Sequence, residues 1–298
     1  MDYYLNLLNT IGIHTLLGLS AYILILTGQV SLAQAGFFAI GAYCAGILTV
    51  IFQWHILPAI CFSMVFSGSL AFLVGFPALR VKGLMLVMAT IAFSEFVRMF
   101  FLNLKWRVVR DGSEIGPDGN MGFAEIRFYS DKGWANWEIT IFLWIFVVLV
   151  MFVLWWSDRT RAGAVLRAVG EDELAANSIG INLTVVKVSA MTVGGMIAGL
   201  AGSLYAHQVS SLDHHTFSVL LATFAISYPI LGGLTNVFGT LVAVIFIQGL
   251  LVEGLRFMGD WRMVLFGVLI VLAMNFKPFG LFDNQTMRII RQGFGIKT

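Results

Sequence analysis

The sequence predicts an all-α integral membrane protein, folded as a polytopic bundle of eight or nine transmembrane helices. Hydrophobic residues (AVILMFWYC) make up 59% of the 298 residues, and charged residues only 11%, against about 25% in soluble domains. The mean hydropathy is +0.88. Apolar stretches that can cross about 30 Å of hydrocarbon, at about 20 residues each, recur along the chain. So few charged side chains cannot cover a soluble globule, so the apolar surplus must face lipid or other helices.

Nine apolar stretches are candidate spans, of which the seventh and ninth are short. The first runs well past the length of a signal-peptide core and lacks a small-residue cleavage signature, so we interpret it as a retained span. In chain order the nine are Leu8–Thr27, Ala33–Phe52, Leu57–Phe76, Gly83–Leu102, Ile139–Trp156, Val188–Ala206, Phe217–Leu231, Val237–Leu255 and Met263–Phe276.

The distribution of Lys and Arg predicts the orientation, because short cytoplasmic loops retain positive charge. With nine spans, three basic regions fall on one side of the membrane, which places the N-terminus outside and the C-terminus in the cytoplasm. Residues 103–138 then form an extracytoplasmic loop over the outer mouth, residues 157–187 a cytoplasmic loop, and residues 284–298 a basic cytoplasmic tail. The basic regions comprise Arg80 and Lys82; Arg159, Arg161, Arg167 and Lys187; and Lys277, Arg288, Arg291 and Lys297.

Glu95 and Arg98 are ionisable residues in the middle of the Gly83–Leu102 span. Being three residues apart, they share a helical face and can pair. A charge in lipid costs a few kcal/mol, so we expect both to point into the bundle or a watery cavity. The pair either belongs to a transport path or gate, or is a structural ion pair that fixes the register of the helix.

The strip GQVSLAQAGFFAIGAY, residues 28–43, interrupts the first apolar run and brings Gln29, Ser31 and Gln34 to the break. Broken helices expose backbone groups, which are tolerated at membrane depth only where protein or a cavity satisfies them. The strip is therefore a candidate lining for the path of a polar solute. The alternative is an ordinary cytoplasmic turn capped by Gln and Ser.

Enzyme and nucleic-acid functions find no support in the sequence. The net charge of +2 is not gathered into a basic stripe, and no P-loop, GxSxG or HExxH motif occurs. We therefore predict no catalytic residue, no metal site and no ATPase site in this chain. A membrane enzyme built on a histidine cluster is a remote alternative, since a His-His pair in a loop rarely provides convergent ligands; its residues are His207, Asp213, His214 and His215.

The polar stretch between the fifth and sixth spans contains a short helical pattern that ends at Gly180. The helix either lies on its own protein or docks into a groove on a partner. Its expected apolar face comprises Val165, Leu166, Val169, Leu174, Ala176 and Ile179, and its expected outward face Arg167, Glu171, Asp172 and Glu173.

The run EDELAANSIGIN, residues 171–182, resembles the coupling helix of ABC importer permeases. That motif has a Glu, paired alanines and, four residues later, a Gly, which correspond here to Glu173, Ala175, Ala176 and Gly180. The longer run RAGAVLRAVGEDELAANSIGIN is similar to the LivM-type permease subunit of branched-chain amino acid importers. Further resemblances to this family are GQVSLAQAGFFAIGAY, KGLMLVMATIAFSEFVR, AGLAGSLYAH, LGGLTNVFGT and FKPFGLF.

The resemblance implies a permease domain over residues 1–283 in a bacterial inner membrane. It implies as partners a homologous second permease, two ATP-binding subunits that hold ATP-Mg, and an extracytoplasmic solute-binding protein, with no cofactor bound by this chain. Candidate pathway residues are Gln29, Ser31, Gln34, Glu95 and Asn236. The alternative is an ATP-independent secondary transporter or channel that uses Glu95 and Arg98.

Departures from the family pattern leave the solute open among branched-chain amino acids, urea, amides and organic acids. Ala33 and Gln34 stand where the family has Gly-His, and Thr235 and Asn236 replace a usual Gly and small residue. Gly239-Thr240 takes the place of Gly-Pro, and RDGSEIG, residues 110–116, differs from the family's outer loop.

Overall fold

The computed structural model describes residues 2–78, 81, 83–110, 113–234, 236–254, 259 and 261–276. Several residues of the orientation argument lie outside this described part, as does the predicted tail over residues 284–298. They are Arg80, Lys82, Lys277, Arg288, Arg291 and Lys297.

The described chain is predominantly helical, and each of the nine predicted stretches corresponds to a helix. Six helices are long and apolar enough to cross a membrane: α1 (Asp2–Leu26), α3 (Ile56–Ala78), α4 (Leu84–Asn103), α6 (Asn136–Asp158), α9 (Leu183–Val209) and the continuous pair α11 (Val237–Val244) and η3 (Ile245–Gly254). Three are shorter: α2 (Gln34–Val50), α10 (Val219–Gly232) and α12 (Trp261–Phe276). The predicted all-α polytopic class is confirmed.

Helix α9 is the centre of the bundle and packs against α1, α2 and α3. Small residues allow this close approach, as they do between helices in lipid generally. A Cβ atom on Gly41 of α2 would overlap the backbone of Gly199 on α9, and one on Gly202 would overlap the carbonyl oxygen of Phe38. Small residues of α9 thus form very close helix contacts in the core.

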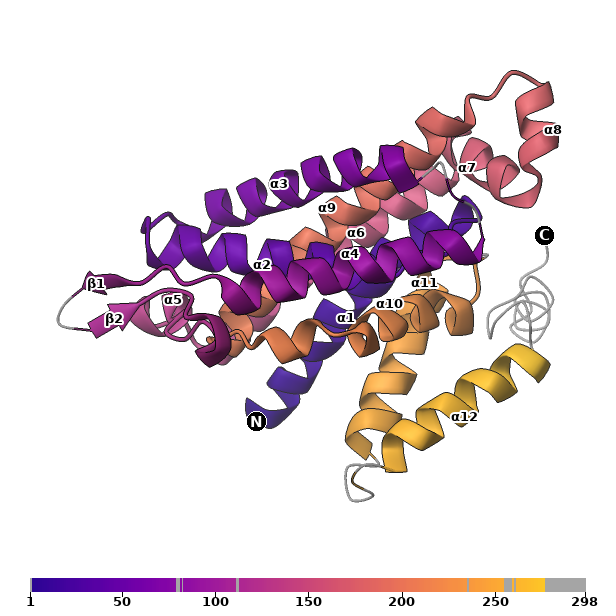
Figure 1. Cartoon of the computed structure of the whole chain (residues 1–298). Helices are drawn as coiled ribbons and strands as arrows, with labels where there is room; N and C mark the ends of the chain where they lie inside the picture. Colours follow the sequence, from indigo (N-terminus) through magenta and orange to yellow (C-terminus); the bar gives the residue numbers. More distant parts are fainter. Residues whose placement is uncertain are drawn as a thin grey trace.

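The remaining long helices lie around this core on different sides. Helix α4 packs on α2, and α6 packs on α1; Figure 1 shows α4 on the near side of the bundle. Helices α10 and α11 pack against α1 and against each other, and α12 follows beside η3 and α10. Each of α3, α4 and α6 therefore has one face that the described residues do not cover.

The two ends of the bundle carry different structures (Figure 1). At one end, residues 103–138 form a cap from the antiparallel strands β1 (Val108–Arg110) and β2 (Ser113–Ile115), the short η1 (Gly119–Met121) and α5 (Phe128–Asp131). A bridge between Phe123 and Leu212 ties this cap to the α9–α10 connection, which includes η2 (His214–Phe217). At the other end, α7 (Arg161–Glu171) and α8 (Glu173–Ser178) project beyond the long helices.

Candidate functional site

The connection between α1 and α2, residues 27–33, is not helical. Its start packs closely against α7. The two backbones approach so closely there that a Cβ atom on Gly170 would overlap the carbonyl oxygen of Leu26. Gly28 has a φ of +72°, a conformation that glycine adopts without steric cost. The predicted break in the first apolar run is therefore confirmed, and the projecting end of the molecule touches it directly.

Two hydroxyls of α4 support the broken backbone. The Leu32 amide donates to Thr90 Oγ1 at 3.0 Å, and Ser94 Oγ donates to the Leu32 carbonyl oxygen at 2.7 Å. The Gly36 amide donates to Ser94 Oγ at 3.2 Å. These bonds satisfy backbone groups that a non-helical segment would otherwise expose at membrane depth. Thr90 was absent from the predicted site, although its spacing of four from Ser94 places both hydroxyls on one helix face.

The three predicted side chains of this connection have different partners. Gln29 is buried, and its Nε2 donates to Thr27 Oγ1 at 3.1 Å and to the Lys187 carbonyl oxygen at 3.3 Å. Ser31 Oγ accepts from the Ala33 amide at 3.2 Å. Gln34 is also fully buried, but neither atom of its carboxamide has a hydrogen-bond partner among the described residues. Gln34 therefore offers both a donor and an acceptor for a polar solute or water.

Glu95 and Arg98 form the ion pair that their spacing predicts. Arg98 Nε donates to Glu95 Oε2 at 2.8 Å. The side chain of Glu95 remains 34% exposed and that of Arg98 18% exposed. The pair thus lies at the outside of this chain's bundle, on α4, and not in its interior.

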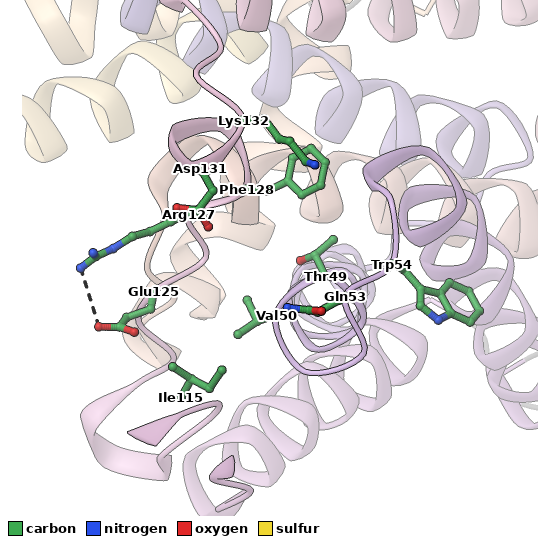
Figure 2. Close-up of a pocket in the computed structure, with 10 residues that line it drawn as sticks. All are labelled: Thr49, Val50, Gln53, Trp54, Ile115, Glu125, Arg127, Phe128, Asp131 and Lys132. Carbon is green, nitrogen blue, oxygen red and sulfur yellow. Dashed lines mark ion pairs between the residues drawn. The ribbon is translucent and has the colours of Figure 1, made fainter. Parts of the chain in front are cut away.

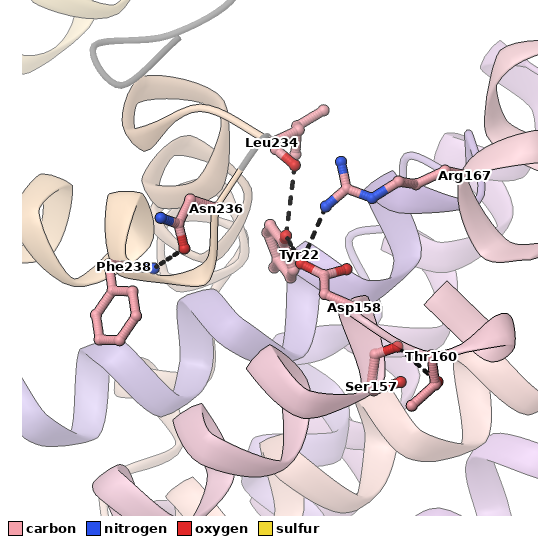
Figure 3. A network of polar contacts seen from close by, with 8 residues as sticks. All are labelled: Tyr22, Ser157, Asp158, Thr160, Arg167, Leu234, Asn236 and Phe238. Carbon is pink, nitrogen blue, oxygen red and sulfur yellow. Dashed lines mark hydrogen bonds and ion pairs between the residues drawn. The ribbon is translucent and has the colours of Figure 1, made fainter. Parts of the chain in front are cut away.

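Asn236 lies in the connection between α10 and α11 and caps α11 (Figure 3). Its Oδ1 accepts from the Phe238 amide at 3.3 Å, as short polar side chains do at helix N-termini. This geometry gives Asn236 a local structural use and does not place it with the α1–α2 connection. Its neighbour Thr235 lies outside the described residues.

A polar network that the sequence reasoning missed joins the spans to α7 (Figure 3). Asp158, the last residue of α6, lies 2.9 Å from Arg167 of α7 and 3.0 Å from the hydroxyl of Tyr22 on α1. The Tyr22 hydroxyl also lies 3.4 Å from the carbonyl oxygen of Leu234, before α11. One carboxylate therefore connects α1, α6 and α7.

The predicted cytoplasmic helix is two helices, so the prediction of one continuous amphipathic helix was wrong. Asp172 ends α7 and caps α8, because its Oδ1 accepts from the amides of Leu174 and Ala175 at 2.8 and 3.0 Å. Such local side-chain bonds favour a helix start over helix continuation. Helix α8 ends at Ser178, and Gly180 has a φ of +87°, as the predicted stop requires.

The division into two helices also divides the expected apolar face. Val169 and Ala176 are buried, whereas the side chains of Leu174 and Ile179 are 82% and 75% exposed. Glu173, which was expected to face outward, instead forms an ion pair through its carboxylate with Lys187 Nζ at the start of α9. Leu174 on α8 and Ile179 just after it therefore point away from the protein, while an ion pair holds α8 to a central span.

A polar cavity of about 530 Å³ lies at the opposite end, between α2 and the cap (Figure 2). Glu125, Arg127, Asp131 and Lys132 give it both signs of charge, and Glu125 lies 3.7 Å from Arg127. This cavity lies in the predicted extracytoplasmic loop and was not part of the predicted site. Its mixed charge suits a zwitterionic or polar solute better than an ion of one sign.

The histidines of the remote enzyme alternative are not gathered in one place. Both ring nitrogens of His207 have hydrogen-bond partners inside the bundle. Nδ1 lies 2.8 Å from the Ser203 carbonyl oxygen, and Nε2 lies 3.1 Å from Thr49 Oγ1. Asp213, His214 and His215 bring their ligand atoms within 4.8 Å of one another. Burial lowers the pKa of His214 below its usual value, and His215 and Arg98 lower it further while Asp213 raises it. The nearby guanidinium of Arg98 also opposes a metal cation at this cluster.

Six membrane-length helices and three shorter apolar ones define the described part of the chain as a polytopic membrane protein. The chain belongs to the family described as "Branched-chain amino acid transport system / permease component", whose model matches residues 3–274. It is therefore a multi-pass permease of the ABC importer class in the bacterial inner membrane. No solved structure matches this chain.

Relatives of known name include permeases for two kinds of solute. The high-affinity branched-chain amino acid transport system permease protein LivM of Salmonella typhimurium is 31% identical over 301 residues, which cover 90% of this chain and 67% of the relative. LivM of Escherichia coli K12 is 30% identical with the same coverage. The ribose import permease protein RbsC of Escherichia coli K12 is 25% identical over 294 residues, covering 94% of this chain and 85% of the relative.

Proposed function

We propose that this chain translocates branched-chain or other hydrophobic amino acids as the permease subunit of an ATP-driven importer. The energy comes from ATP hydrolysis in two partner subunits that hold ATP-Mg, and this chain binds no cofactor of its own. A homologous second permease completes the path, and an extracytoplasmic binding protein delivers the solute. The similarity to LivM at 31% identity supports the amino acid class over the sugar class.

The observation that carries the coupling role is the exposure of α8 at the end of the bundle. Leu174 and Ile179 are large apolar side chains that lie almost wholly in water in this chain alone. Such paired anchors on a short helix fit a hydrophobic groove on a partner. Because the Glu173–Lys187 ion pair ties α8 to α9, a partner that moves α8 also moves the central span.

Movement at α8 reaches the solute path by two connections. Lys187 also accepts, through its carbonyl oxygen, the hydrogen bond from Gln29 in the broken connection. Arg167 of α7 pairs with Asp158, which in turn contacts Tyr22 on α1. ATP binding can therefore change the arrangement of α1, α9 and the connection, provided that the ATP-binding subunits bind one arrangement better than the other.

Copurification tests the coupling role directly. Tagged protein from gently solubilised native membranes should retain a P-loop ATPase, and Glu173→Lys should lose it because a lysine there repels Lys187. The double variant Glu173→Lys with Lys187→Glu restores the ion pair and should recover part of the binding. If folded wild-type protein retains no ATPase in several mild detergents, the ATP-independent transporter that uses Glu95 and Arg98 replaces this proposal.

Uptake by membrane vesicles loaded with ATP tests the solute class. Labelled leucine should accumulate in vesicles that contain the complete importer and its binding protein, and labelled ribose should not. Replacing Gln34 by Leu removes a buried donor and acceptor that have no hydrogen-bond partner among the residues described, with little change in volume. It should reduce leucine uptake while ATPase copurification stays unchanged. Accumulation of ribose in place of leucine would overturn the proposed solute.

A further inference from the structure

Helix α1 is exposed along one polar strip in the first half of its length. Of residues 9–24, only Thr10 and His14 are not buried among the described residues. They lie four positions apart, so they share one side of the helix with the exposed Asn6, one turn further out. A side of a spanning helix that meets lipid is apolar, as the exposed side of α6 is. We term Asn6, Thr10 and His14 the α1 strip.

The α1 strip begins at the predicted extracytoplasmic end of the bundle and reaches the middle of the span. Asn136, which follows the cap at the start of α6, donates through Nδ2 to Asp2 Oδ1 at 2.9 Å, so α1 begins beside the cap. Gln208, near the end of α9, donates through Nε2 to Asn6 Oδ1 at 3.1 Å. His14 is the thirteenth of the 25 residues of α1. It therefore lies at a depth where polar groups face protein or water.

Two buried side chains from other helices hold the imidazole of His14. Gln248 lies on η3, which is π-helical, a rare geometry that is frequent at functional sites. Its Nε2 donates to the Tyr228 hydroxyl at 2.7 Å, and that hydroxyl lies 2.8 Å from His14 Nδ1. Since the Tyr228 oxygen accepts from Gln248, its own proton goes to Nδ1, and the proton of the neutral ring lies on Nε2. Nε2 has no hydrogen-bond partner among the described residues.

Close packing ends the α1 strip one turn further in, at Gly18. A Cβ atom on Gly18 would overlap the Thr240 methyl group of α11 at 2.8 Å and lie 3.0 Å from Tyr228 Cβ. Thr240 is fully buried, and its hydroxyl has no hydrogen-bond partner in the part of the chain that the structure describes. Such a group is uncommon, because burial has removed its hydrogen bonds to water. The closed end of the strip thus has two polar groups without partners, on His14 and Thr240.

We propose that the α1 strip is the outer half of the solute path, and that His14 Nε2 donates a hydrogen bond there to the carboxylate of the amino acid. This inference rests on the proposed function, which supplies an amino acid as the solute. A hydrogen bond to an ionised acceptor is shorter and stronger than one between neutral groups. The contact at Gly18 closes the path below this point in the arrangement that the structure shows.

Thr10 can receive the ammonium group of the same solute. Its Oγ1 donates to the Asn6 carbonyl oxygen at 3.0 Å, which leaves the lone pairs of Oγ1 to accept a hydrogen bond. Thr10 lies four residues outward from His14, about 6 Å along the helix axis at 1.5 Å a residue. An ammonium and a carboxylate carried by one carbon atom can bridge that distance through two hydrogen bonds.

Apolar side chains beside His14 suit the rest of a hydrophobic amino acid. The Phe224 ring lies edge-on to the His14 ring, with centroids 6.4 Å apart, and Ile11 belongs to the same apolar cluster as Phe224. Sites for small molecules are mostly apolar, with a few placed polar groups that fix the orientation. A sugar would bring several hydroxyls against these apolar groups, where they would lack partners.

Combined substitutions separate a role of His14 in transport from a structural role. His14→Leu with Tyr228→Phe and Gln248→Leu removes all three polar groups together, which orphans none of them and should leave the unfolding temperature in detergent unchanged. Leucine uptake by ATP-loaded vesicles with the complete importer and its binding protein should fall about tenfold or more, as expected when a hydrogen bond to a charged group is lost. The matched control keeps Tyr228→Phe and Gln248→Leu but carries His14→Gln, whose amide nitrogen can replace Nε2. It should recover uptake several-fold.

Thiol labelling tests the course of the path without altering His14. Cys44 and Cys61 are first replaced by Ala, in protein that still accumulates leucine. A cysteine is then placed at Thr10 or, as a matched control, at Leu8, which is 41% exposed on another side of α1. A membrane-impermeant maleimide added outside reacts with the thiolate, which forms only in contact with water. Thr10→Cys should react several-fold faster than Leu8→Cys although Thr10 is the less exposed residue, and leucine with its binding protein should slow the reaction.

Two results overturn the inference: equal labelling of Thr10→Cys and Leu8→Cys, or wild-type leucine uptake by the folded variant with three apolar replacements. If that variant has a lowered unfolding temperature, the labelling comparison decides alone. Wild-type protein is measured alongside for uptake and ATPase copurification. If it shows both while either overturning result appears, only the α1 strip is wrong. If it shows neither, the proposed function has failed instead.

Discussion

Helices α4 and α6 are similar in length and position but differ in what their uncovered faces carry. Both could cross a membrane, and about a third or less of each is buried within the chain, 28% for α4 and 33% for α6. The exposed side chains of α6 within the hydrocarbon depth are all aliphatic or aromatic, and Trp137 and Trp156 lie near its two ends. The exposed side of α4 carries the Glu95–Arg98 ion pair, methionines and Ala92 besides Leu84, Phe96 and Phe100.

The difference between the two helices shows that a helix face left exposed in a single membrane chain can be suited either to lipid or to protein and water. Aliphatic side chains between terminal tryptophans are the composition expected of a lipid-facing helix, since tryptophan favours the membrane interface. A partly exposed carboxylate at mid-depth, with flexible and small neighbours, is the composition expected of a protein-facing or water-facing helix. Four substitutions can break or sharpen this distinction, and they are given from the largest expected effect to the smallest.

The largest effect should come from a charge on the lipid-like face of α6. Val148→Arg places a guanidinium near the middle of α6, where insertion costs about 3 kcal/mol. We expect much less subunit in the membrane fraction after alkaline extraction, whereas Val148→Met at the same position should behave as wild type. Normal membrane levels of Val148→Arg would mean that this face of α6 also meets protein or water.

A smaller effect should follow when α4 loses one partner of its ion pair. Removing one member of a buried pair costs about 3–5 kcal/mol, but partial exposure of Glu95 and Arg98 reduces this to about 1–2 kcal/mol. Arg98→Leu should therefore lower the unfolding temperature in detergent, and the double variant with Glu95→Gln should recover most of the loss. No recovery would indicate that Arg98 acts through other contacts, such as those at His214.

Larger side chains on the exposed faces of α4 and α6 should distinguish an effect on subunit assembly from an effect on folding. Ala92→Phe adds bulk to the exposed side of α4 between Met88 and Met99, and overpacking an interface costs about 1–3 kcal/mol. The variant should retain several-fold less of the second permease on copurification, with an unchanged unfolding temperature for the isolated subunit. Val153→Phe on the exposed face of α6 is the control and should retain wild-type assembly; equal losses from both would remove the distinction between the helices.

The smallest effect concerns pH, at the contact between α4 and η2. His215, Asp213 and Arg98 face His214, whose pKa lies below its usual value. Because the unfolded chain binds a proton that the folded chain does not, stability should fall as pH drops below about 6.5. His214→Gln should lessen, without abolishing, the fall in unfolding temperature between pH 7.5 and 5.5, whereas His55→Gln, at an exposed histidine, should keep the wild-type slope.

Particular residues show where sequence reasoning succeeded and where it failed. The Glu95–Arg98 pair was predicted because it depends on spacing along one helix. The single cytoplasmic helix was wrong because Asp172 caps α8 locally, a competition that apolar periodicity does not register. The roles of Gln29, Gln34 and Asn236 in transport remain predictions. The structure gives Gln29 and Asn236 structural hydrogen bonds, whereas the carboxamide of Gln34 has no partner within the described part of the chain.

The sequence by itself determined the fold class, the approximate spans, the break after α1 and the resemblance to importer permeases. These follow from composition and from patterns a few residues long, which need no knowledge of neighbours. Only the tertiary structure decided that Thr90 and Ser94 support the backbone at Leu32, that Asp158 joins α1 to α7, and that α4 leaves Glu95 uncovered. Contacts between residues 58 or 136 positions apart depend on how helices pack, and packing follows from the shapes of whole helix faces.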